Sequence, residues 1–259
     1  MPRANRYLLP GQFCHITHRC HNRALLLRCV RDRDEYRLRL RAAATAHGVA
    51  VLTYCITSNH VHIVAGAAST ATIAGMMQQL EGEFARSYNR RKRRGGAFWE
   101  GRYHATMIER GAHLWNCMVY VDLNMVRAGV VSHPRAWAWC GYQELTNRRK
   151  RYRLVDTRAV HECMLETKAL TLADYYEECI ARGLEADAIR HASRWTESIA
   201  VGSQHYVNAV AEQERQRTRL AIEKEAGDCW CLRDNAEPYG RFFGAKQGCK
   251  PLKFPCADT

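Results

Sequence analysis

Two histidines two positions apart are the first residues in this chain whose types and spacing suggest chemistry. His60 and His62 lie in the sequence NHVHIV, and side chains at positions i and i+2 of a β-strand project from the same face of a sheet. Two imidazoles on one face suit a single divalent metal ion, although with 12 histidines in the chain such a pair also arises by chance. The pair predicts a metal site only if a third ligand comes from elsewhere.

The sequence YVDLNMVRAG offers that third ligand together with a nucleophile. Tyr120, Asn124 and Arg127 stand at i, i+4 and i+7 and share one stripe of a helix, although a stripe of this kind also suits a helix that faces water. A tyrosine hydroxyl has a pKa of about 10 and is scarcely ionised at neutral pH. It becomes a competent nucleophile toward a phosphodiester when a metal neutralises the phosphate. Asn124 and the two histidines are neutral ligands, which leave Mg²⁺ or Mn²⁺ its full charge.

The elements that must position these residues follow from the hydrophobic pattern. We expect strands over residues 12–20, 49–57, 60–65 and 99–109, and helices over residues 32–47, 70–91 and 113–127. This order is typical of an α+β fold with a ferredoxin-like (RRM-like) antiparallel sheet and two helices on one face. The last helix, which carries Tyr120, could then lie against the other face of the sheet.

Charge is distributed unevenly along the chain. The net charge is +13, and residues 1–150 carry 23 basic and 9 acidic side chains, whereas the remainder is nearly balanced. Arginine makes up 32 of the 39 basic residues, and its planar guanidinium is suited to phosphate and base contacts. A polyanion such as nucleic acid is therefore the partner that the first part of the chain favours.

The change in composition also predicts the domain organisation. We expect one domain over residues 1–148, which holds the candidate site, and a mainly helical C-terminal extension over residues 149–259 that could bind DNA or a partner. No stretch has the ~20 apolar residues of a membrane span, and the first residues lack the apolar core of a signal peptide. We therefore expect a cytoplasmic protein with mostly reduced, buried cysteines.

Several of these segments resemble a known family. HVHIV resembles the HUH signature (His, hydrophobic, His) of single-tyrosine insertion-sequence transposases. HITHR, SNHVHIV, FWEGRYHATMIE, YVDLNMVRAGVV and WAWCGY are similar, in this order, to segments of the REP-associated branch of that family, across about residues 6–145. Two segments depart from the family pattern: Met125 stands where proline is usual, and Thr57 and Ser58 stand where Met-Pro is usual.

The resemblance implies the ferredoxin-like fold and a metal-dependent cleavage of single-stranded DNA at or near a hairpin, such as a repetitive palindromic element. Tyr120 would be the nucleophile, forming a 5′-phosphotyrosine and freeing a 3′-OH, and His60, His62 and Asn124 would hold Mg²⁺ or Mn²⁺. Because transesterification conserves the bond energy, the same site could rejoin strands. Proteins of this kind include monomers and homodimers, so the oligomeric state stays open.

Basic and aromatic residues near these segments are candidates for DNA contacts. Five adjacent cations at residues 90–94 cannot all pair internally, and the N-terminal arm could read a guide sequence beside the hairpin. The candidate DNA-binding residues are Arg3, Arg6, Arg90, Arg91, Lys92, Arg93, Arg94, Arg102 and Arg127. Phe98, Trp99 and Tyr103 could stack on unpaired bases, although at least one of them is expected in the core.

Two weaker features complete the set of candidates. His15 and His18 fall on opposite faces of the first strand, so they cannot share a site, and we expect His15 to have a packing role although it could border the active site. Cys229, Cys231, Cys249 and Cys256 lie in a tail expected to be irregular, and their spacing is unlike that of a regular zinc knuckle.

Three functions therefore compete. The first is a transposase-like enzyme that cleaves and rejoins single-stranded DNA. The second is a module of the same fold that binds single-stranded nucleic acid without chemistry, and the third is a zinc-stabilised regulatory protein. The presence of His60, His62, Tyr120 and Asn124 at compatible positions favours the first, because binding alone needs none of them.

Overall fold

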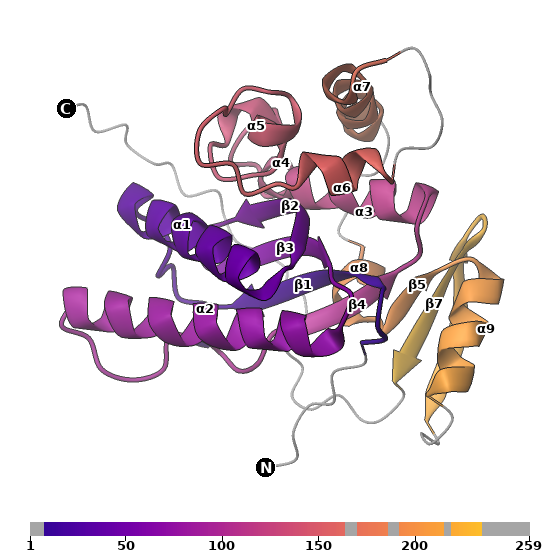
Figure 1. The fold of residues 1–259 in the computed structure, drawn as a ribbon, viewed down its shortest axis with the longest axis horizontal. Helices are drawn as coiled ribbons and strands as arrows, with labels where there is room; N and C mark the ends of the chain where they lie inside the picture. Colours follow the sequence, from indigo (N-terminus) through magenta and orange to yellow (C-terminus); the bar gives the residue numbers. More distant parts are fainter. Residues whose placement is uncertain (1–7, 164–169, 186–191, 215–218, 235–259) are drawn as a thin grey trace.

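A computed structural model describes residues 8–163, 170–185, 192–214 and 219–234. Within these residues one seven-stranded sheet has the strand order β2-β3-β1-β4-β5-β7-β6. Neighbouring strands are antiparallel except for β4 and β5, which are parallel. Helices lie along both faces of this sheet (Figure 1).

The first part of the chain confirms the expected ferredoxin-like arrangement. Its elements are β1 (Phe13–Arg19), α1 (Val30–His47), β2 (Ala50–Ile56), β3 (His60–Gly66), α2 (Thr70–Arg91) and β4 (His104–Ile108), with a short 3-10 helix at His21–Arg23. The two long helices α1 and α2 lie side by side on one face (Figure 1). The sheet therefore has one face covered by α1 and α2, and the opposite face is available to the segments that follow β4.

Local sequence explains why α1 and α2 form where they do. The apolar side chains of α2 recur at helical spacing and are buried against the sheet: Ile73, Met76, Met77, Leu80 and Phe84. The hydroxyl of Ser69 accepts a hydrogen bond from Ala71 N and caps the first turn of α2. Gly48, at φ 62°, ends α1 in the left-handed conformation that glycine adopts without strain.

The helix expected over residues 113–127 is interrupted. The structure has α3 (Ala112–Asp122) and a short α4 (Asn124–Arg127), separated by Leu123 at φ −79° and ψ 4°. The interruption occurs although Met125 replaces the proline of the family pattern. Eight of the eleven residues of α3 are buried, because the helix is enclosed between the second face of the sheet and the C-terminal extension.

The extension contains the expected helices and also completes the sheet. A 3-10 helix (Pro134–Ala136) and α5 (Tyr142–Leu145) come before position 149, and the helices of the extension are α6 (Thr157–His161), α7 (Leu172–Glu185), α8 (Arg194–Glu197) and α9 (Gln204–Gln213). Its strands are β5 (Ala200–Gly202), β6 (Leu220–Ala226) and β7 (Cys229–Asp234). The prediction of an irregular tail from Cys229 is therefore wrong as far as Asp234. Pairing with β5 and β6 makes this segment a strand, and its own short alternation gives little sign of it.

Residues on both sides of position 148 share one hydrophobic core. Leu154, Val160, Tyr176 and Trp195 are buried in the same cluster as the side chains between the first sheet strands and their helices. Gly141 shows how closely the connecting segment approaches the sheet, since a Cβ there would lie 2.0 Å from the hydroxyl oxygen of Thr53. In the described part of the chain, no helix combines the length and apolar character needed to cross a membrane.

Candidate active site

The two histidines of NHVHIV project from one face of β3, as their spacing predicts. Their ring centroids are 4.9 Å apart and their ring planes are nearly perpendicular, at 82°. This is the face that α3 covers, because the ring of Tyr120 lies edge-on to that of His62, with 6.5 Å between the centroids. The sheet and α3 therefore bring together residues that lie about 60 positions apart in the sequence.

A chain of hydrogen bonds fixes the orientation of His62. His15 Nδ1 lies 2.8 Å from the carbonyl oxygen of Trp195, His15 Nε2 lies 2.9 Å from His62 Nδ1, and His62 Nε2 lies 2.9 Å from Asn124 Nδ2. A carbonyl oxygen can only accept, so a neutral His15 carries its proton on Nδ1 and accepts on Nε2. His62 must then carry its proton on Nδ1, which leaves the lone pair of its Nε2 directed at Asn124.

His60 is oriented in a similar way by its own turn. Its Nδ1 lies 2.7 Å from the Asn59 side-chain oxygen and 3.0 Å from the Thr57 hydroxyl oxygen. Donation from Nδ1 to Asn59 leaves Nε2 of His60 as the nitrogen with the lone pair. Both histidines of the pair thus present Nε2 lone pairs, and each has an Nδ1–H held by an acceptor. Metal-binding histidines commonly have this second hydrogen bond.

Tyr120 is enclosed by aromatic and cationic side chains. Its side chain is buried, and its ring centroid lies 6.1 Å from that of Trp195 in α8. The guanidinium carbon of Arg127 lies 3.7 Å from the centroid of the Tyr120 ring. Within the described residues, the two terminal nitrogens of Arg127 have no hydrogen-bonding partner. This buried cation is therefore directed at the site, and no carboxylate there neutralises its charge.

Burial controls the protonation of the site. It lowers the pKa of His15 to about 3, and it lowers that of His60 to about 3 with help from the nearby positive charges of Arg19 and Arg127. The pKa of His62 is also well below its usual value, for the same reason. The imidazoles are therefore neutral at physiological pH, which is the form that binds metals. Burial raises the pKa of Tyr120, and the guanidinium of Arg127 acts in the opposite direction.

The donor set fits a divalent metal held by neutral ligands. It consists of two imidazole nitrogens and a side-chain amide, whose oxygen can replace its nitrogen by rotation about one bond. Within the described residues, no group of three or more His, Cys, Asp or Glu side chains is arranged to hold a metal ion, so a site here depends on Asn124. Cys249 and Cys256 of the tail lie outside the described residues, and Cys229 and Cys231 are unpaired thiols.

The candidate DNA-binding residues have different environments. Arg3 and Arg6 lie outside the described residues, and Arg90, Lys92, Arg93 and Arg102 are exposed. Arg91 is instead held by α1, 2.8 Å from Asp32 and 3.0 Å from Glu35, and Arg94 donates to Asn89 and to the carbonyl of Ala97. The expectation that this run binds phosphate stays a prediction, and within the run the charges of Arg91 and of Lys92, which lies 3.9 Å from Asp32, are met by carboxylates of α1 that the local sequence lacks.

The aromatic residues proposed to stack on bases are packed into the protein. Phe98 and Tyr103 are buried, and Trp99 stacks on His18 with 4.1 Å between ring centroids. His18 and Trp99 lie on the α2 side of the sheet, where Trp99 Nε1 donates to the carbonyl of Glu81. These three rings contribute to the core, and the stacking expectation fails for Phe98 and Tyr103.

Sequence reasoning underrated His15 and did not identify Trp195. His15 pairs with Val64 and His62 pairs with Thr17 across β1 and β3, so the two histidines are diagonal neighbours on one face. Once the pairing of β1 with β3 was known, the alternation of side chains within HITHR could have placed His15 on the same face of the sheet as His60 and His62. No signal in the sequence connects Trp195, 180 positions away, with that face.

Comparison with known proteins connects this geometry to a family. The sequence model described as "Transposase IS200 like" matches residues 11–124, which include Tyr120 and all three candidate metal ligands. Among solved structures, the chain is similar to a REP-associated tyrosine transposase bound to a REP hairpin, with 14% identity over 57% of this chain and 87% of that chain and a TM-score of 0.46. It is also similar to a protein from Deinococcus radiodurans assigned as a transposase, with 18% identity, 50% and 92% coverage and a TM-score of 0.34. No protein with a curated description matches the chain.

Proposed function

The chain belongs to the IS200-like transposase family through residues 11–124, and on that premise we propose that it cleaves and rejoins single-stranded DNA through Tyr120. The substrate class is hairpin or palindromic single-stranded DNA, and the reaction serves DNA transposition or the processing of repeated elements in the cytoplasm. Either a monomer or a homodimer is compatible with this proposal.

One observation carries the proposal. The hydrogen-bonded series from Trp195 O through His15 and His62 to Asn124 ends beside Tyr120. A module that only binds nucleic acid has no use for an oriented imidazole lone pair next to a buried tyrosine. The strongly basic first part of the chain supports a polyanionic substrate.

The proposed reaction is a phosphoryl transfer to the tyrosine. The Tyr120 oxygen forms a bond to phosphorus as the bond from phosphorus to the 3′ oxygen breaks, and the tyrosine proton is released while the departing strand gains one as its 3′-OH. The 5′ strand stays attached as a phosphotyrosine ester. A second 3′-OH then attacks the same phosphorus in the reverse sense and rejoins the strands without an external energy source.

The remaining side chains have supporting roles. His60, His62 and Asn124 would hold Mg²⁺ or Mn²⁺, which would supply Lewis-acid polarisation of a phosphate oxygen. Arg127 lies against the Tyr120 ring and stabilises negative charge on the tyrosine oxygen as its proton leaves. Burial of Tyr120 beside Trp195 excludes water, which limits hydrolysis of the phosphotyrosine.

A covalent-adduct assay tests this proposal. The protein is mixed with labelled single-stranded hairpin DNA from the sequence that flanks its own gene, with Mg²⁺ or Mn²⁺, and is separated on a denaturing gel. We expect a shifted protein–DNA band that disappears with EDTA and in Tyr120→Phe. Tyr175→Phe is the matched control, because Tyr175 packs on Trp115 away from the site, and it should form the adduct normally.

Two results would reverse the assignment. Binding of DNA without an adduct in either metal would favour a non-catalytic single-strand-binding module. Loss of the folded state on addition of EDTA would indicate a structural metal, since the proposed ion takes part in the reaction and is not needed for the core.

A further inference from the structure

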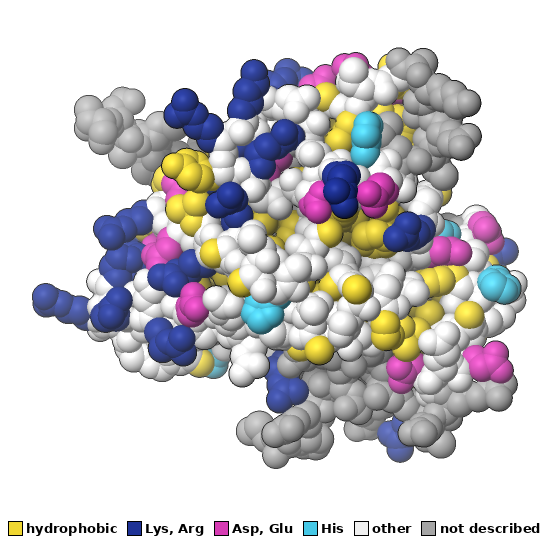
Figure 2. Space-filling model, in the orientation of Figure 1, with side chains coloured by type: hydrophobic (Ala, Val, Ile, Leu, Met, Phe, Trp, Pro, Cys, Tyr) yellow, Lys and Arg dark blue, Asp and Glu magenta, His cyan; other side chains and the backbone are white. Residues whose placement is uncertain are grey.

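A basic pocket lies between α1 and the chain that follows α5, at the β2 edge of the sheet. It has a volume of about 580 Å³, and its lining contains no acidic residue. The residues that line it are Arg37, Ala138, Gln143, Arg148, Arg149, Lys150, Arg151 and Tyr152. On the face seen in Figure 2, Lys and Arg side chains gather along the left and upper left. A pocket with this basic lining favours a ligand that carries several negative charges.

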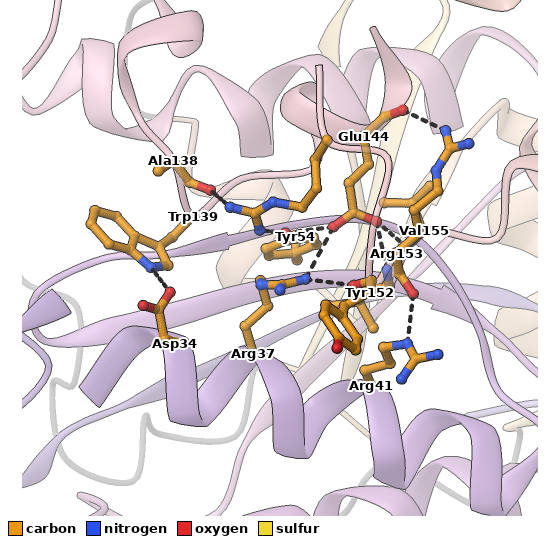
Figure 3. A network of polar contacts seen from close by, with 12 residues as sticks. Asp34, Arg37, Arg41, Tyr54, Ala138, Trp139, Glu144, Tyr152, Arg153 and Val155 are labelled. Atoms are coloured by element: carbon orange, nitrogen blue, oxygen red, sulfur yellow. Dashed lines mark hydrogen bonds and ion pairs between the residues drawn. The ribbon is translucent and has the colours of Figure 1, made fainter. Parts of the chain in front are cut away.

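The pocket has a fixed framework. Arg37 Nη1 donates to the carbonyl of Tyr152 over 2.8 Å, and Arg149 Nη2 donates to the carbonyl of Ala138 over 2.9 Å. The carboxylate of Glu144 is fully buried, lies 3.5 Å from Arg37 and accepts from Tyr54 OH and Val155 N. Figure 3 shows Arg37 reaching from α1 between Glu144 and Tyr152. The arginines thus hold the loop in place before any ligand arrives.

The cations at the mouth of the pocket are not neutralised. Lys150 and Arg151 are exposed, and neither is paired with an acidic side chain in the described part of the chain. Arg148 lies 3.7 Å from Glu177, where both side chains are about half exposed, and such a pair contributes little. This contrasts with Arg91, whose charge is matched by two carboxylates of α1.

Tyr152 is displayed beside these cations. Its side chain is 66% exposed, and its backbone is in the left-handed region at φ 51°, which a bulky residue seldom adopts. The hydrogen bond from Arg37 to its carbonyl helps hold the backbone there. An exposed ring next to successive cations is the usual combination for single-stranded nucleic acid, in which bases stack on aromatic rings and phosphates meet basic side chains.

The pocket is connected to the candidate active site by one segment. Ala138, on its wall, lies between Trp137, which donates from Nε1 to the carbonyl of Ile56, and Trp139, whose carbonyl accepts from Ile56 N. Ile56 ends β2, and the turn after it leads directly to His60. The guanidinium of Arg33 lies 3.9 Å from the Trp139 ring centroid and adds a further cation beside this segment.

From these observations we propose that the pocket is a second DNA-binding site, which takes the phosphate backbone of a single strand outside the cleavage position and stacks one unpaired base on Tyr152. The inference deepens the proposed function and rests on it for the identity of the polymer. A flat surface of cations would suit duplex DNA as well, but the exposed ring has a use only where bases are unpaired.

Binding measurements with the full chain test the role of the ring. The probes are fluorescent oligonucleotides with one hairpin, either without a tail or with single-stranded tails of increasing length, and anisotropy gives Kd at several salt concentrations. Tyr152→Leu should weaken binding of the tailed probe about tenfold and leave the tail-free hairpin within twofold. Tyr152→Phe keeps the ring and should bind like the unaltered protein.

The charges are tested separately. Lys150→Ala/Arg151→Ala should lower the slope of log Kd against log salt by about 1.4 for the tailed probe, or roughly 0.7 for each lost phosphate contact. The matched control is Arg158→Ala/Arg182→Ala, which removes two exposed arginines of the extension. It should leave the slope unchanged, and an equal fall in the control would reduce the effect to overall charge and overturn the inference.

Failure of this inference and failure of the proposed function are distinguishable. Binding is measured in Tyr120→Phe, so it does not depend on cleavage, and a ring-dependent loss without any adduct in the unaltered protein would retain the second site while rejecting the enzyme. If instead the unaltered protein formed the adduct and the Tyr152→Leu substitution left binding of the tailed probe unchanged, the enzyme would be retained and the second site rejected. Crosslinking to 5-iododeoxyuridine placed in the tail should label Tyr152, and labelling elsewhere only would count against the pocket.

Discussion

The two halves of the sheet contribute different things to one site. The half made of β2, β3, β1 and β4, with α3 and α4, carries each of the candidate reacting groups. The half made of β5, β7 and β6 carries none of them, yet α8 beside it supplies the carbonyl of Trp195 that orients His15 and the ring that packs on Tyr120. The difference shows that chemical groups and the environment that tunes them come from separate parts of the chain.

Besides the backbone pairing of β4 with β5, the contact between the halves includes side chains of the first half that bond to backbone carbonyls around α8. His15 bonds to the carbonyl of Trp195, while Thr106 and His104 both bond to that of Ser198, over 2.7 and 3.1 Å. Each of these donors comes from the first half and each acceptor from the short segment around α8. Buried carbonyls must be paired, so this segment is fixed in position by polar residues of the first half.

Removing a reacting group of the first half should have the largest effect. His62→Ala should lower the rate of adduct formation about 1000-fold, equivalent to ~4 kcal/mol, because a metal ligand is lost. The melting temperature should change much less than the rate. A loss of adduct that merely tracked unfolding, seen by circular dichroism, would make His62 a structural residue.

Removing the Trp195 side chain, which the second half packs against Tyr120, should mainly lower the free energy of unfolding. Trp195 is almost fully buried, and Trp195→Ala should reduce the free energy of unfolding by about 3–5 kcal/mol. Trp195→Phe retains a ring against Tyr120 and should cost less. If urea titration gave Trp195→Ala the stability of the unaltered protein, the extension would not be part of this core.

Cutting the connection between the halves should affect metal binding. His15→Phe removes the acceptor for His62 Nδ1–H and should weaken Mn²⁺ binding about 10- to 100-fold, the usual cost of losing such a partner. The affinity can be followed by calorimetry or by electron paramagnetic resonance. His15→Gln retains a side-chain acceptor and should restore part of the affinity, which a packing role alone would not predict.

The same histidine should make stability depend on pH. The pKa of His15 falls from 6.5 to about 3 on folding because the ring is buried, so between these values the unfolded chain binds more protons. Stability is therefore full above pH 6.5 and is lost as the pH falls toward 3, by ~2 kcal/mol from this residue at pH 5. The difference in unfolding free energy between pH 7 and pH 5 should be smaller in His15→Gln.

The smallest effect is expected from a substitution of Thr106, which donates to the carbonyl of Ser198. Thr106→Val removes one donor to Ser198 O and leaves His104 as the remaining one, so it should cost about 1 kcal/mol of unfolding free energy. Metal affinity should fall much less than in His15→Phe, because Thr106 lies opposite His15 across β1 and β4 and its hydroxyl bonds to Ser198 O and to His104, outside the His62 series. If Mn²⁺ affinity fell as much as in His15→Phe, the hydrogen bonds to Ser198 O and to Trp195 O would be coupled, and His15 would not orient His62 independently of Thr106.

Hydrophobic periodicity predicted most of the first half of the fold. Helix α2 begins and ends where its apolar stripe predicts, at Thr70 and Arg91, and the order of strands and helices follows from the same pattern. The interruption at Leu123 and the strands β5, β6 and β7 did not follow. Those strands are short or depend on pairing with partners far along the chain, and local sequence carries little of that information.

The sequence by itself determined which chemical groups are present and that His60 and His62 share a face, because a strand alternates its side chains regardless of context. It also determined that Tyr120 and Asn124 are four positions apart, whereas the interruption at Leu123 places them in two different helices. Only the tertiary structure decided that His15 orients His62 and that Trp195 encloses Tyr120. It also decided that Arg91 is paired with carboxylates, whereas Lys150 and Arg151 have no acidic partner among the described residues. Hydrogen bonds and ion pairs between residues far apart in the chain depend on how the elements pack, and no local pattern records that packing.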